Sequence, residues 1–396
     1  MSKFELLAPA GDLEKLKVAI LYGANAVFIG GEKFSLRSRA SNFTISDIKE
    51  ACDFAHKHNA KIHVTCNIVM HNLDIDGLLD YLKDLEACGV DAIITSSLYM
   101  MDLALKNTQM EVHVSTQEST LNSKACKFYE DLGVNRVVLG RELDIDSIRR
   151  IRENTKTDLE VFIHGGMCAS YSGRCMLSNN MTNRDANRGG CAHSCRWNYN
   201  LYESGQKINR ENDYFSMSSK DLCAVRYIKD LMDIGVNSFK IEGRMKSLHY
   251  VASITNTYRK LIDEYEKTGE IKDITIYEEM INKAENRLTS VGFLRGIFTT
   301  KEQLYDLNLS VPTKTFVGLV KDYDESSNLV HIEQRNYFTP HSKLEVFSPT
   351  ESFIIEIAEI YDKDGNVLDA ARHPLQDIYF KCNRKLEPYD MLRLLW

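Results

Sequence analysis

Short apolar runs alternate with amphipathic segments along the first two-thirds of the chain. Eight runs have the length and composition of buried strands: Glu5–Ala8, Ala26–Gly30, Lys61–Asn67, Ala92–Thr95, Glu111–Thr116, Arg136–Leu139, Leu159–His164 and Ser238–Glu242. Between the first seven lie segments of helical periodicity, such as Asp12–Tyr22, Ser46–His58, Asp76–Cys88, Asn122–Leu132 and Asp144–Asn154. Strands that alternate with helices at this spacing build a parallel sheet.

A glycine recurs just before the next predicted strand, at Gly23, Gly89, Gly133 and Gly235, where it can end a helix. Eight strand–helix units are the number found in a closed barrel, so the sequence predicts an α/β fold, a (β/α)₈ TIM-like barrel over residues 1–300. An open doubly wound sheet is the alternative. The turn after the first strand lacks the glycine spacing of a dinucleotide-binding fingerprint.

The regular pattern is interrupted after the seventh predicted strand by an insertion at about residues 165–236. In a barrel this loop opens on the C-terminal face, where active sites are assembled. Beyond residue 311 the character changes, because five of the six prolines lie there, among alternating apolar runs. These runs, Phe316–Val320, Leu329–Glu333, Leu344–Phe347 and Phe353–Ile360, predict a small antiparallel β barrel or sandwich over residues 311–396.

Composition adds limits on location and partners. A chain of 396 residues that is 43% hydrophobic and 27% charged is typical of a soluble globular protein. We expect a cytoplasmic protein with no membrane contact, because no apolar run approaches the ~18 residues of a membrane span and no targeting segment is visible. The net charge of -7 argues against a nonspecific nucleic-acid coat, yet the stretch from Gly165 to Arg210 holds six Arg or Lys and only two acids. That stretch is either a local basic site or a solvated loop with scattered arginines.

The ten cysteines do not form a disulfide framework if the protein is in a reducing compartment. Five of them, Cys52, Cys66, Cys88, Cys126 and Cys382, stand alone among apolar neighbours, which is typical of small buried side chains. The other five are gathered between residues 168 and 223, and that clustering needs a separate cause.

Four cysteines of the insertion are the principal metal-ligand candidates. Cys168 and Cys175 are separated by six residues, and Cys191 and Cys195 by three. Four thiolates could hold an iron–sulfur cluster or zinc. The wide first spacing favours a [4Fe–4S] cluster, while zinc and plain structural cysteines stay as alternatives. Cys223 is an alternate ligand, at the start of an expected helix over Asp221–Ile234.

Several stretches together resemble the collagenase-like peptidase family U32, over essentially the whole chain. They are Leu6–Gly11, Glu160–Cys168 with Gly173–Ser178, Asn187–Cys191 with Cys195–Trp197, and Phe239–Ser247. The resemblance implies oxygen-independent hydroxylation, since family members act in forming 5-hydroxyuridine at the tRNA wobble position, 5-hydroxycytidine in ribosomal RNA, or hydroxylated ubiquinone. This chain is most similar to the tRNA branch.

The same resemblance implies a [4Fe–4S] cluster, with prephenate, a small dicarboxylate, as the source of the hydroxyl group. Cys168, Cys175 and Cys191 match the cysteine positions that the family shares, and the fourth ligand moves within the family. An electron donor is a further possible partner.

Two other functions stay open. A peptidase is the first, although no zinc-peptidase motif and no nucleophile elbow occur, so a free-cysteine peptidase would use Cys168 with His164. The second is a non-catalytic RNA- or protein-binding module with a structural metal.

Residues that end predicted strands are candidates for the site itself. Asn67 and Gln117 could read a base edge, or simply cap turns. His164 could act as a general acid–base, or bond to backbone. Arg141 and Arg244 could bind a dicarboxylate, with Glu242 orienting Arg244 or Lys240; an ion-pair ring that stiffens the barrel rim is the alternative.

The basic insertion supplies candidates for RNA contacts. Arg174, Arg188 and Arg196 could bind phosphates, and Trp197 or Tyr199 could stack on a base, unless Trp197 belongs to a local core.

Overall fold

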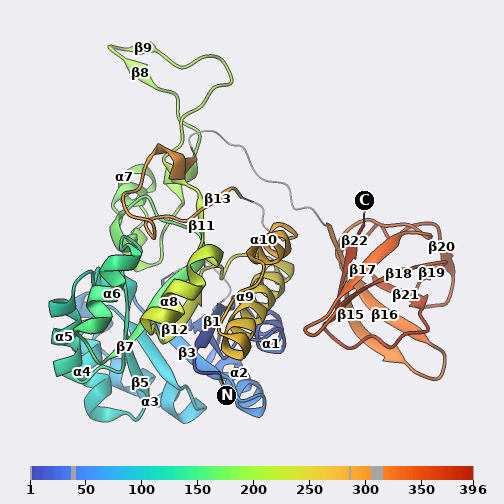
Figure 1. The fold of residues 1–396 in the computed structure, drawn as a ribbon, viewed down its shortest axis with the longest axis horizontal. Coiled ribbons are helices and arrows are strands. Elements are labelled where there is room, and N and C mark those ends of the chain that lie inside the picture. The colour runs from blue at the N-terminus through green and yellow to red at the C-terminus, as the bar shows by residue number, and fades with distance from the viewer. Residues whose placement is uncertain (1, 37–41, 285–286, 305–314, 396) are drawn as a thin grey trace. The chain divides into compact units, whose positions relative to one another are not determined.

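The computed structural model describes residues 2–36, 42–284, 287–304 and 315–395. It divides into two compact units, which the ribbon distinguishes clearly (Figure 1). The first unit comprises Met1–Glu278 and Arg287–Ser310, and the second comprises Glu279–Asn286 and Val311–Trp396.

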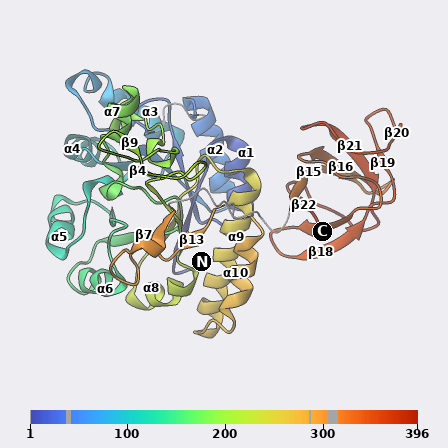
Figure 2. The ribbon, with the colours of Figure 1, turned by 90° about the horizontal axis from the view of Figure 1, so that it is seen from above.

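Eight parallel strands of the first unit close into a barrel. They are β1 (Glu5–Pro9), β2 (Ala26–Gly30), β3 (Lys61–Cys66), β4 (Ala92–Thr95), β5 (Glu111–Val114), β6 (Arg136–Val138), β7 (Asp158–Gly165) and β12 (Ser238–Ile241). Each pairs with the next, and β12 pairs with both β7 and β1, which closes the ring. The helices surround the strands (Figure 2), so the predicted TIM-like barrel is confirmed.

Most barrel helices begin at polar caps. The helices are α1 (Leu13–Leu21), α2 (Ile45–Lys57), α3 (Leu78–Cys88), α4 (Leu98–Asn107), α5 (Ser123–Leu132), α6 (Ile145–Glu153), α8 (Ile228–Ile234) and α9 (Leu248–Thr268), followed by α10 (Ile274–Asn282). The side chains of Asp12, Asn122 and Asp144 each accept a hydrogen bond from the first turn of their helix, whereas α3 follows Gly77 and α8 follows Tyr227 without a side-chain cap. No helix in the described ranges combines the length and the apolar character that crossing a membrane requires.

A network of buried charged residues lies inside the barrel. The Glu160 carboxylate (β7) lies 2.7 Å from the Lys240 ammonium (β12) and 3.2 Å from the Arg136 guanidinium (β6). Arg136 also pairs with Glu5 of β1. Burial opposes ionisation of Glu160, but Lys240 and Arg136 hold its pKa below the ordinary value. The network joins the strands on both sides of the barrel seam.

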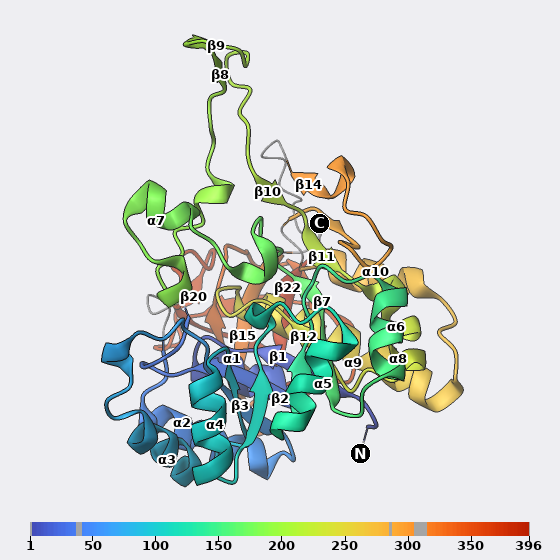
Figure 3. The ribbon, with the colours of Figure 1, turned by 90° about the vertical axis from the view of Figure 1, so that its left-hand side faces the viewer.

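The insertion between β7 and β12 contains short elements that fold over the barrel. They are η3 (Tyr171–Gly173), α7 (Leu177–Thr182), η4 (Ala186–Arg188), η5 (Ser194–Arg196), β8 (Tyr202–Glu203), β9 (Gln206–Lys207), β10 (Ser218–Ser219), β11 (Asp221–Cys223) and η6 (Val225–Tyr227). The β8–β9 hairpin projects away from the barrel (Figure 3). Two short strands that follow α10, β13 (Thr289–Ser290) and β14 (Gln303–Leu304), pair with β11 and β10.

The helix expected over Asp221–Ile234 is wrong in its first half. Residues Asp221–Cys223 form strand β11, which pairs antiparallel with the end of β7, and α8 starts only at Ile228. Asp221 does not cap a helix, because its carboxylate lies 3.1 Å from the Lys246 ammonium and 3.5 Å from Arg287.

The second unit contains one antiparallel sheet, which confirms the predicted C-terminal β domain. Its strands are β15 (Thr315–Asp324), β16 (Leu329–Gln334), β17 (Lys343–Phe347), β18 (Ser352–Glu356), β19 (Ile360–Tyr361), β20 (Val367–Leu368), β21 (Asp377–Lys381) and β22 (Met391–Leu394). They follow the order β18-β17-β22-β15-β16-β21-β19-β20 around a buried apolar core.

Two glycines test how tightly the barrel mouth is built. Gly165 ends β7 with a φ of 101°, and a side chain there would meet the main-chain oxygen of Glu242. Gly133 ends α5 with a φ of 93° and has open space around it. We expect Gly133→Ala to cost about 1 kcal/mol from backbone strain alone. Gly165→Ala should cost about 3 kcal/mol, because strain and collision add. Thermal unfolding measures both, and equal losses would contradict the close approach.

Candidate active site

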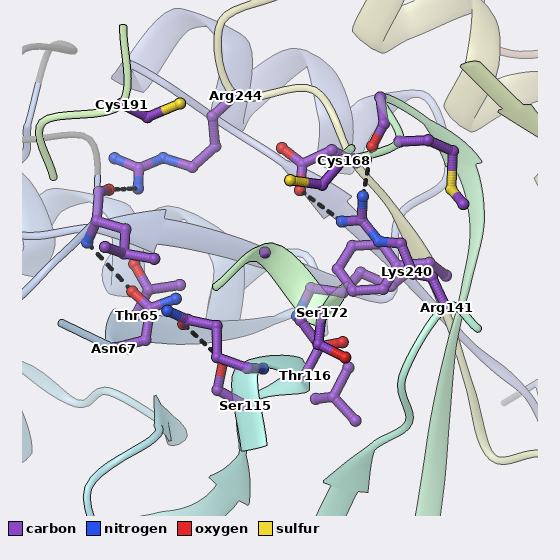
Figure 4. A pocket seen from close by; sticks show the side chains of 18 of the residues that line it. Thr65, Asn67, Ser115, Thr116, Arg141, Cys168, Ser172, Cys191, Lys240 and Arg244 are labelled. Carbon is purple, nitrogen blue, oxygen red and sulfur yellow. Dashed lines mark hydrogen bonds and ion pairs between the residues drawn. The ribbon is translucent and has the colours of Figure 1, made fainter. Parts of the chain in front are cut away.

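A cavity of about 240 Å³ lies at the C-terminal end of the barrel strands, beneath the insertion (Figure 4). Its walls come from the strands and the loops that follow them, and the insertion contributes the remaining side. The cavity therefore occupies the position at which TIM barrels carry their chemistry.

Three of the four predicted ligands, Cys168, Cys191 and Cys195, line this cavity. Figure 4 shows Cys168 and Cys191 reaching it from different segments of the insertion. Cys175 is not part of the lining, but its thiol lies near enough to influence the others. Burial raises the pKa of Cys195, and the neighbouring thiols of Cys168, Cys191 and Cys175 raise it further. The structure thus gathers all four cysteines around one end of the barrel.

Main-chain N–H groups support two of these sulfur atoms. The N–H of Ser170 donates to Cys168 Sγ at 3.4 Å, and that of Leu177 donates to Cys175 Sγ at 3.2 Å. Burial raises the pKa of Cys168, whereas the Ser170 N–H and the Arg141 guanidinium lower it. Such donors stabilise sulfur that carries negative charge, as in a bound thiolate.

A four-iron cluster and a single metal ion require different spacings of their thiolate ligands. Within the described ranges, no group of three or more His, Cys, Asp or Glu side chains is close enough to share one metal ion. Four thiolates around one zinc would each lie about 2.3 Å from it. The thiolates of a four-iron cluster bind separate irons and stand further apart. An all-thiolate set with N–H support has the chemistry that either a cluster or zinc requires.

Cys223, the alternate ligand, is not brought to the cavity. It lies in β11 opposite His164 of β7, and its thiol interacts with the buried hydroxyl of Tyr258 on α9. His164, the predicted general acid–base, also contacts Tyr258 and lies outside the cavity. It is fully buried, its Nδ1 lies 3.2 Å from the Tyr258 hydroxyl, and it is absent from the cavity lining.

Arg141 and Arg244 flank the cavity on opposite sides (Figure 4). Arg141 donates to the main-chain oxygen of Gly166, lies 3.2 Å from the Glu242 carboxylate and stacks 3.7 Å from the centre of the Phe162 ring. Arg244 donates to Ser35 Oγ at 3.1 Å, the carbonyl of Leu36 at 3.2 Å and Asn42 Oδ1 at 3.2 Å. Both guanidinium groups are fixed by protein acceptors.

Asn67 and Gln117, the predicted amides, both line the cavity. Asn67 Oδ1 accepts a hydrogen bond from the N–H of Leu36 at 3.2 Å. Gln117 Oε1 accepts one from the Ser115 hydroxyl at 3.1 Å, while Gln117 Nε2 has no acceptor among the described residues. A buried amide donor without a partner is costly unless a ligand provides one.

The three arginines predicted to contact phosphate differ in their surroundings. Arg174 pairs with Glu118 at 2.5 Å, and Arg188 forms a two-pronged pair with Asp74 and donates to the carbonyl of Val69 at 2.8 Å. Arg196 lines the cavity, and no ion pair to it occurs in the described part of the chain.

The two aromatic candidates lie close to Arg196 along the chain. Trp197 is 41% exposed, which agrees better with a surface role than with a local core. The Tyr199 hydroxyl donates to the carbonyl of Ser194 at 2.7 Å, so this ring is held against the insertion.

Sequence reasoning named Lys240 only as a possible partner of Glu242, and it missed Phe28 and Phe162 of the cavity. They lie on strands at positions that alternate with outward-facing residues. That alternation is a signal that could have selected them, because every second residue of a barrel strand faces the interior. Glu142 was also missed; its carboxylate accepts hydrogen bonds from the N–H and hydroxyl of Ser172, at 2.6 and 3.0 Å.

The chain is similar to known proteins over its whole length. The model of peptidase family U32 matches residues 11–303, and that of the peptidase family U32 C-terminal domain matches residues 312–393. The "tRNA hydroxylation protein P1" of Bacillus subtilis is 46% identical over 99% of this chain and 94% of its own length.

Two other relatives have different names. A 23S rRNA 5-hydroxycytidine synthase of Escherichia coli is 41% identical over 66% of this chain and 39% of its own length. A "Collagenase" of Porphyromonas gingivalis is 35% identical over 99% of this chain and 98% of its own length.

The Arg188–Asp74 pair should hold the cysteine loop in place. We expect Arg188→Gln to remove about 1 kcal/mol of local stability and to speed amide hydrogen exchange several-fold in residues 185–192. Arg184→Gln, in the same loop, is the matched control, and similar exchange in both variants would refute the structural role.

The same pair should depend on pH. The hydrogen bonds from Arg188 are the main cause that lowers the pKa of Asp74 to about 2, below the ~3.9 of an unfolded chain. The stabilisation is therefore complete above about pH 4 and is lost as the pH falls toward 2. The protection factors of the loop amides, which correct for the intrinsic pH dependence of exchange, should fall only in that acidic range.

Proposed function

Since the chain belongs to peptidase family U32, we propose that it is an RNA-hydroxylating enzyme whose substrate is the wobble uridine of tRNA, converted to 5-hydroxyuridine. The observation that carries the proposal is the cavity at the barrel mouth, which three cysteines line and a fourth adjoins. Full-length similarity to a protein named for tRNA hydroxylation supports the choice of RNA.

Cys168, Cys175 and Cys191 would hold a [4Fe–4S] cluster, with Cys195 as the fourth ligand, because Cys195 lies near these three thiols whereas the Cys223 thiol interacts with Tyr258. When bound, the cluster would supply one-electron redox chemistry at the cavity. Zinc in the same place would supply no electron transfer. A reduced protein partner could serve as the electron donor.

The cavity walls suit a single flat base. Phe28 and Phe162 offer apolar faces, and the side-chain amides of Asn67 and Gln117 offer directional hydrogen bonds to a base edge. The RNA beyond that nucleotide would pass over the rim, where Arg196 can meet a phosphate and the exposed Trp197 can stack on a neighbouring base. In this arrangement the protein binds and orients the uridine and excludes water from it.

Prephenate is proposed as the source of the hydroxyl group. It is a dicarboxylate, and cations surround the cavity: Arg141 and Arg244 at the sides, Arg196 near the insertion and Lys240 in the barrel. Glu242 would orient Arg141 rather than act as a base, since the two side chains form an ion pair at 3.2 Å.

Peptidase activity is the second candidate, favoured by the relative named collagenase. His193 lines the cavity together with Cys168, so a cysteine peptidase would use this pair and not His164. Such an enzyme would cleave gelatin after its iron had been removed. A cluster-dependent hydroxylase would not.

Deleting the gene tests the proposed function directly. We expect 5-hydroxyuridine to fall at least tenfold in bulk tRNA, measured by mass spectrometry of nucleosides, and to return with the wild-type gene. An unchanged level in a strain that has no second pathway would overturn the assignment. A loss of 5-hydroxycytidine from ribosomal RNA instead would reassign the substrate.

Cysteine variants test the metal. After anaerobic purification, the wild-type protein should contain about four irons and absorb near 400 nm. Cys168→Ala and Cys191→Ala should lose most of the iron and the absorbance, whereas Cys382→Ala in the second unit should retain both. Equal iron in all of them, or zinc in place of iron, would contradict the cluster.

A further inference from the structure

We propose that Lys240 forms an anion subsite in the cavity and binds a carboxylate of a small organic acid whose apolar body packs against Phe28 and Phe162. The inference deepens the proposed function, because it assigns the acid-binding role to a residue other than Arg141 and Arg244. It applies to any small acid of this chemistry.

Lys240 is buried, and it is one of the residues that line the cavity. The residue is 4% exposed, and its Nζ lies 4.7 Å from the centre of the Phe28 ring and 5.4 Å from that of the Phe162 ring. All three residues line the cavity, and Figure 4 shows Lys240 on the same side as Arg141. A buried lysine at a cavity is costly to maintain, which makes it a candidate for function.

Glu160 holds the ammonium of Lys240 in place. Its carboxylate lies 2.7 Å from Lys240 Nζ and also accepts from Arg136 and Ser238, each at 3.2 Å. The negative charge of Glu160 is therefore shared between two cations. Of the three N–H donors of Lys240, one is directed to Glu160, and no other hydrogen-bond acceptor for it occurs among the described residues. The remaining donors are available to a ligand.

The arginines are less suited to the same task. Arg141 is bound to Gly166 and Glu242, and Arg244 to Ser35, Leu36 and Asn42. Each guanidinium thus contacts more protein acceptors than the Lys240 ammonium, which contacts Glu160 alone among the described residues.

The side chains around Lys240 indicate what kind of group the carboxylate should be attached to. Ile94 and Val138 continue the apolar wall that Phe28 and Phe162 begin. The unpartnered Nε2 of Gln117 can donate to a second oxygen of the ligand. A carboxylate attached to an apolar ring or chain satisfies both the cation and the wall, whereas a short hydrophilic diacid satisfies only the first.

Calorimetry on the anaerobically purified full-length protein tests this subsite. The probes are prephenate, phenylpyruvate, the methyl ester of phenylpyruvate, and succinate. The wild-type protein should bind prephenate and phenylpyruvate at least tenfold more tightly than the ester or succinate. Binding of the ester as tight as that of the acid, or no binding of either acid, would overturn the proposal.

Two variants test whether Lys240 supplies the positive charge that binds the acid. Lys240→Met alone leaves Glu160 buried with one cation fewer and can fail to fold, so Lys240→Met with Glu160→Gln removes the pair together. The double variant should bind phenylpyruvate at least tenfold more weakly at unchanged iron content. Lys246→Met, which removes a lysine paired with Asp221 outside the cavity, is the matched control and should bind normally. Unchanged affinity in the double variant would refute the role of Lys240.

Failure of the Lys240 subsite can be distinguished from failure of the proposed RNA-hydroxylating function. If gene deletion left 5-hydroxyuridine intact while acid binding still depended on Lys240, the RNA assignment would fail and the subsite would stand. If deletion abolished the nucleoside and the double variant bound acids normally, the reverse would hold.

Discussion

The barrel must close between β7 and β12, although the chain leaves β7 for a long insertion before it returns. The Glu160–Lys240 ion pair lies across this seam at 2.7 Å, and Arg136 and Glu5 extend it to β6 and β1. A buried ion pair of this kind adds little to the free energy of folding, but it favours one register of the strands. In any other register a buried charge would be left without its partner, which would raise the free energy of that arrangement. Closure sets the position of every side chain at the mouth, including the cysteines.

The insertion is anchored to the barrel by side chains that might otherwise be assigned to ligands. Asn187 accepts a hydrogen bond from the N–H of Cys175 at 3.2 Å and donates to its carbonyl at 3.1 Å, while Arg188 pairs with Asp74. Glu142 binds the N–H of Ser172, a non-glycine residue with a φ of 49°. These contacts fix the loop on either side of Cys175. Since Arg174 and Arg188 are paired with Glu118 and Asp74, the basic charge of the insertion is partly structural.

The sequence predicted the barrel well because strand length, helix caps and the recurring glycine before each strand all indicate one architecture. It predicted less of the site, for reasons that depend on register. Glu160 and Phe162 face the interior, so simple alternation would turn His164 inward too. A shift in the β7–β12 pairing at Lys240/Ile241, together with the added strand β11, places it against Tyr258 instead. Lys240 was named only as a possible partner of Glu242, because a lysine in a strand ordinarily faces solvent.

The distinction between a hydroxylase and a peptidase depends on what the gathered thiols can do. A nucleophilic cysteine needs a lowered pKa, usually from a nearby imidazole or a helix N-terminus. Burial and the neighbouring thiols instead raise the pKa of Cys168 and Cys195; His164 is bonded to Tyr258, while the His193 imidazole lines the same cavity. Several thiols that raise one another's pKa are poor nucleophiles alone, but a metal centre deprotonates them and removes their mutual repulsion. A shared role as ligands of one metal centre, as proposed above, would explain why the fold brings these four side chains together.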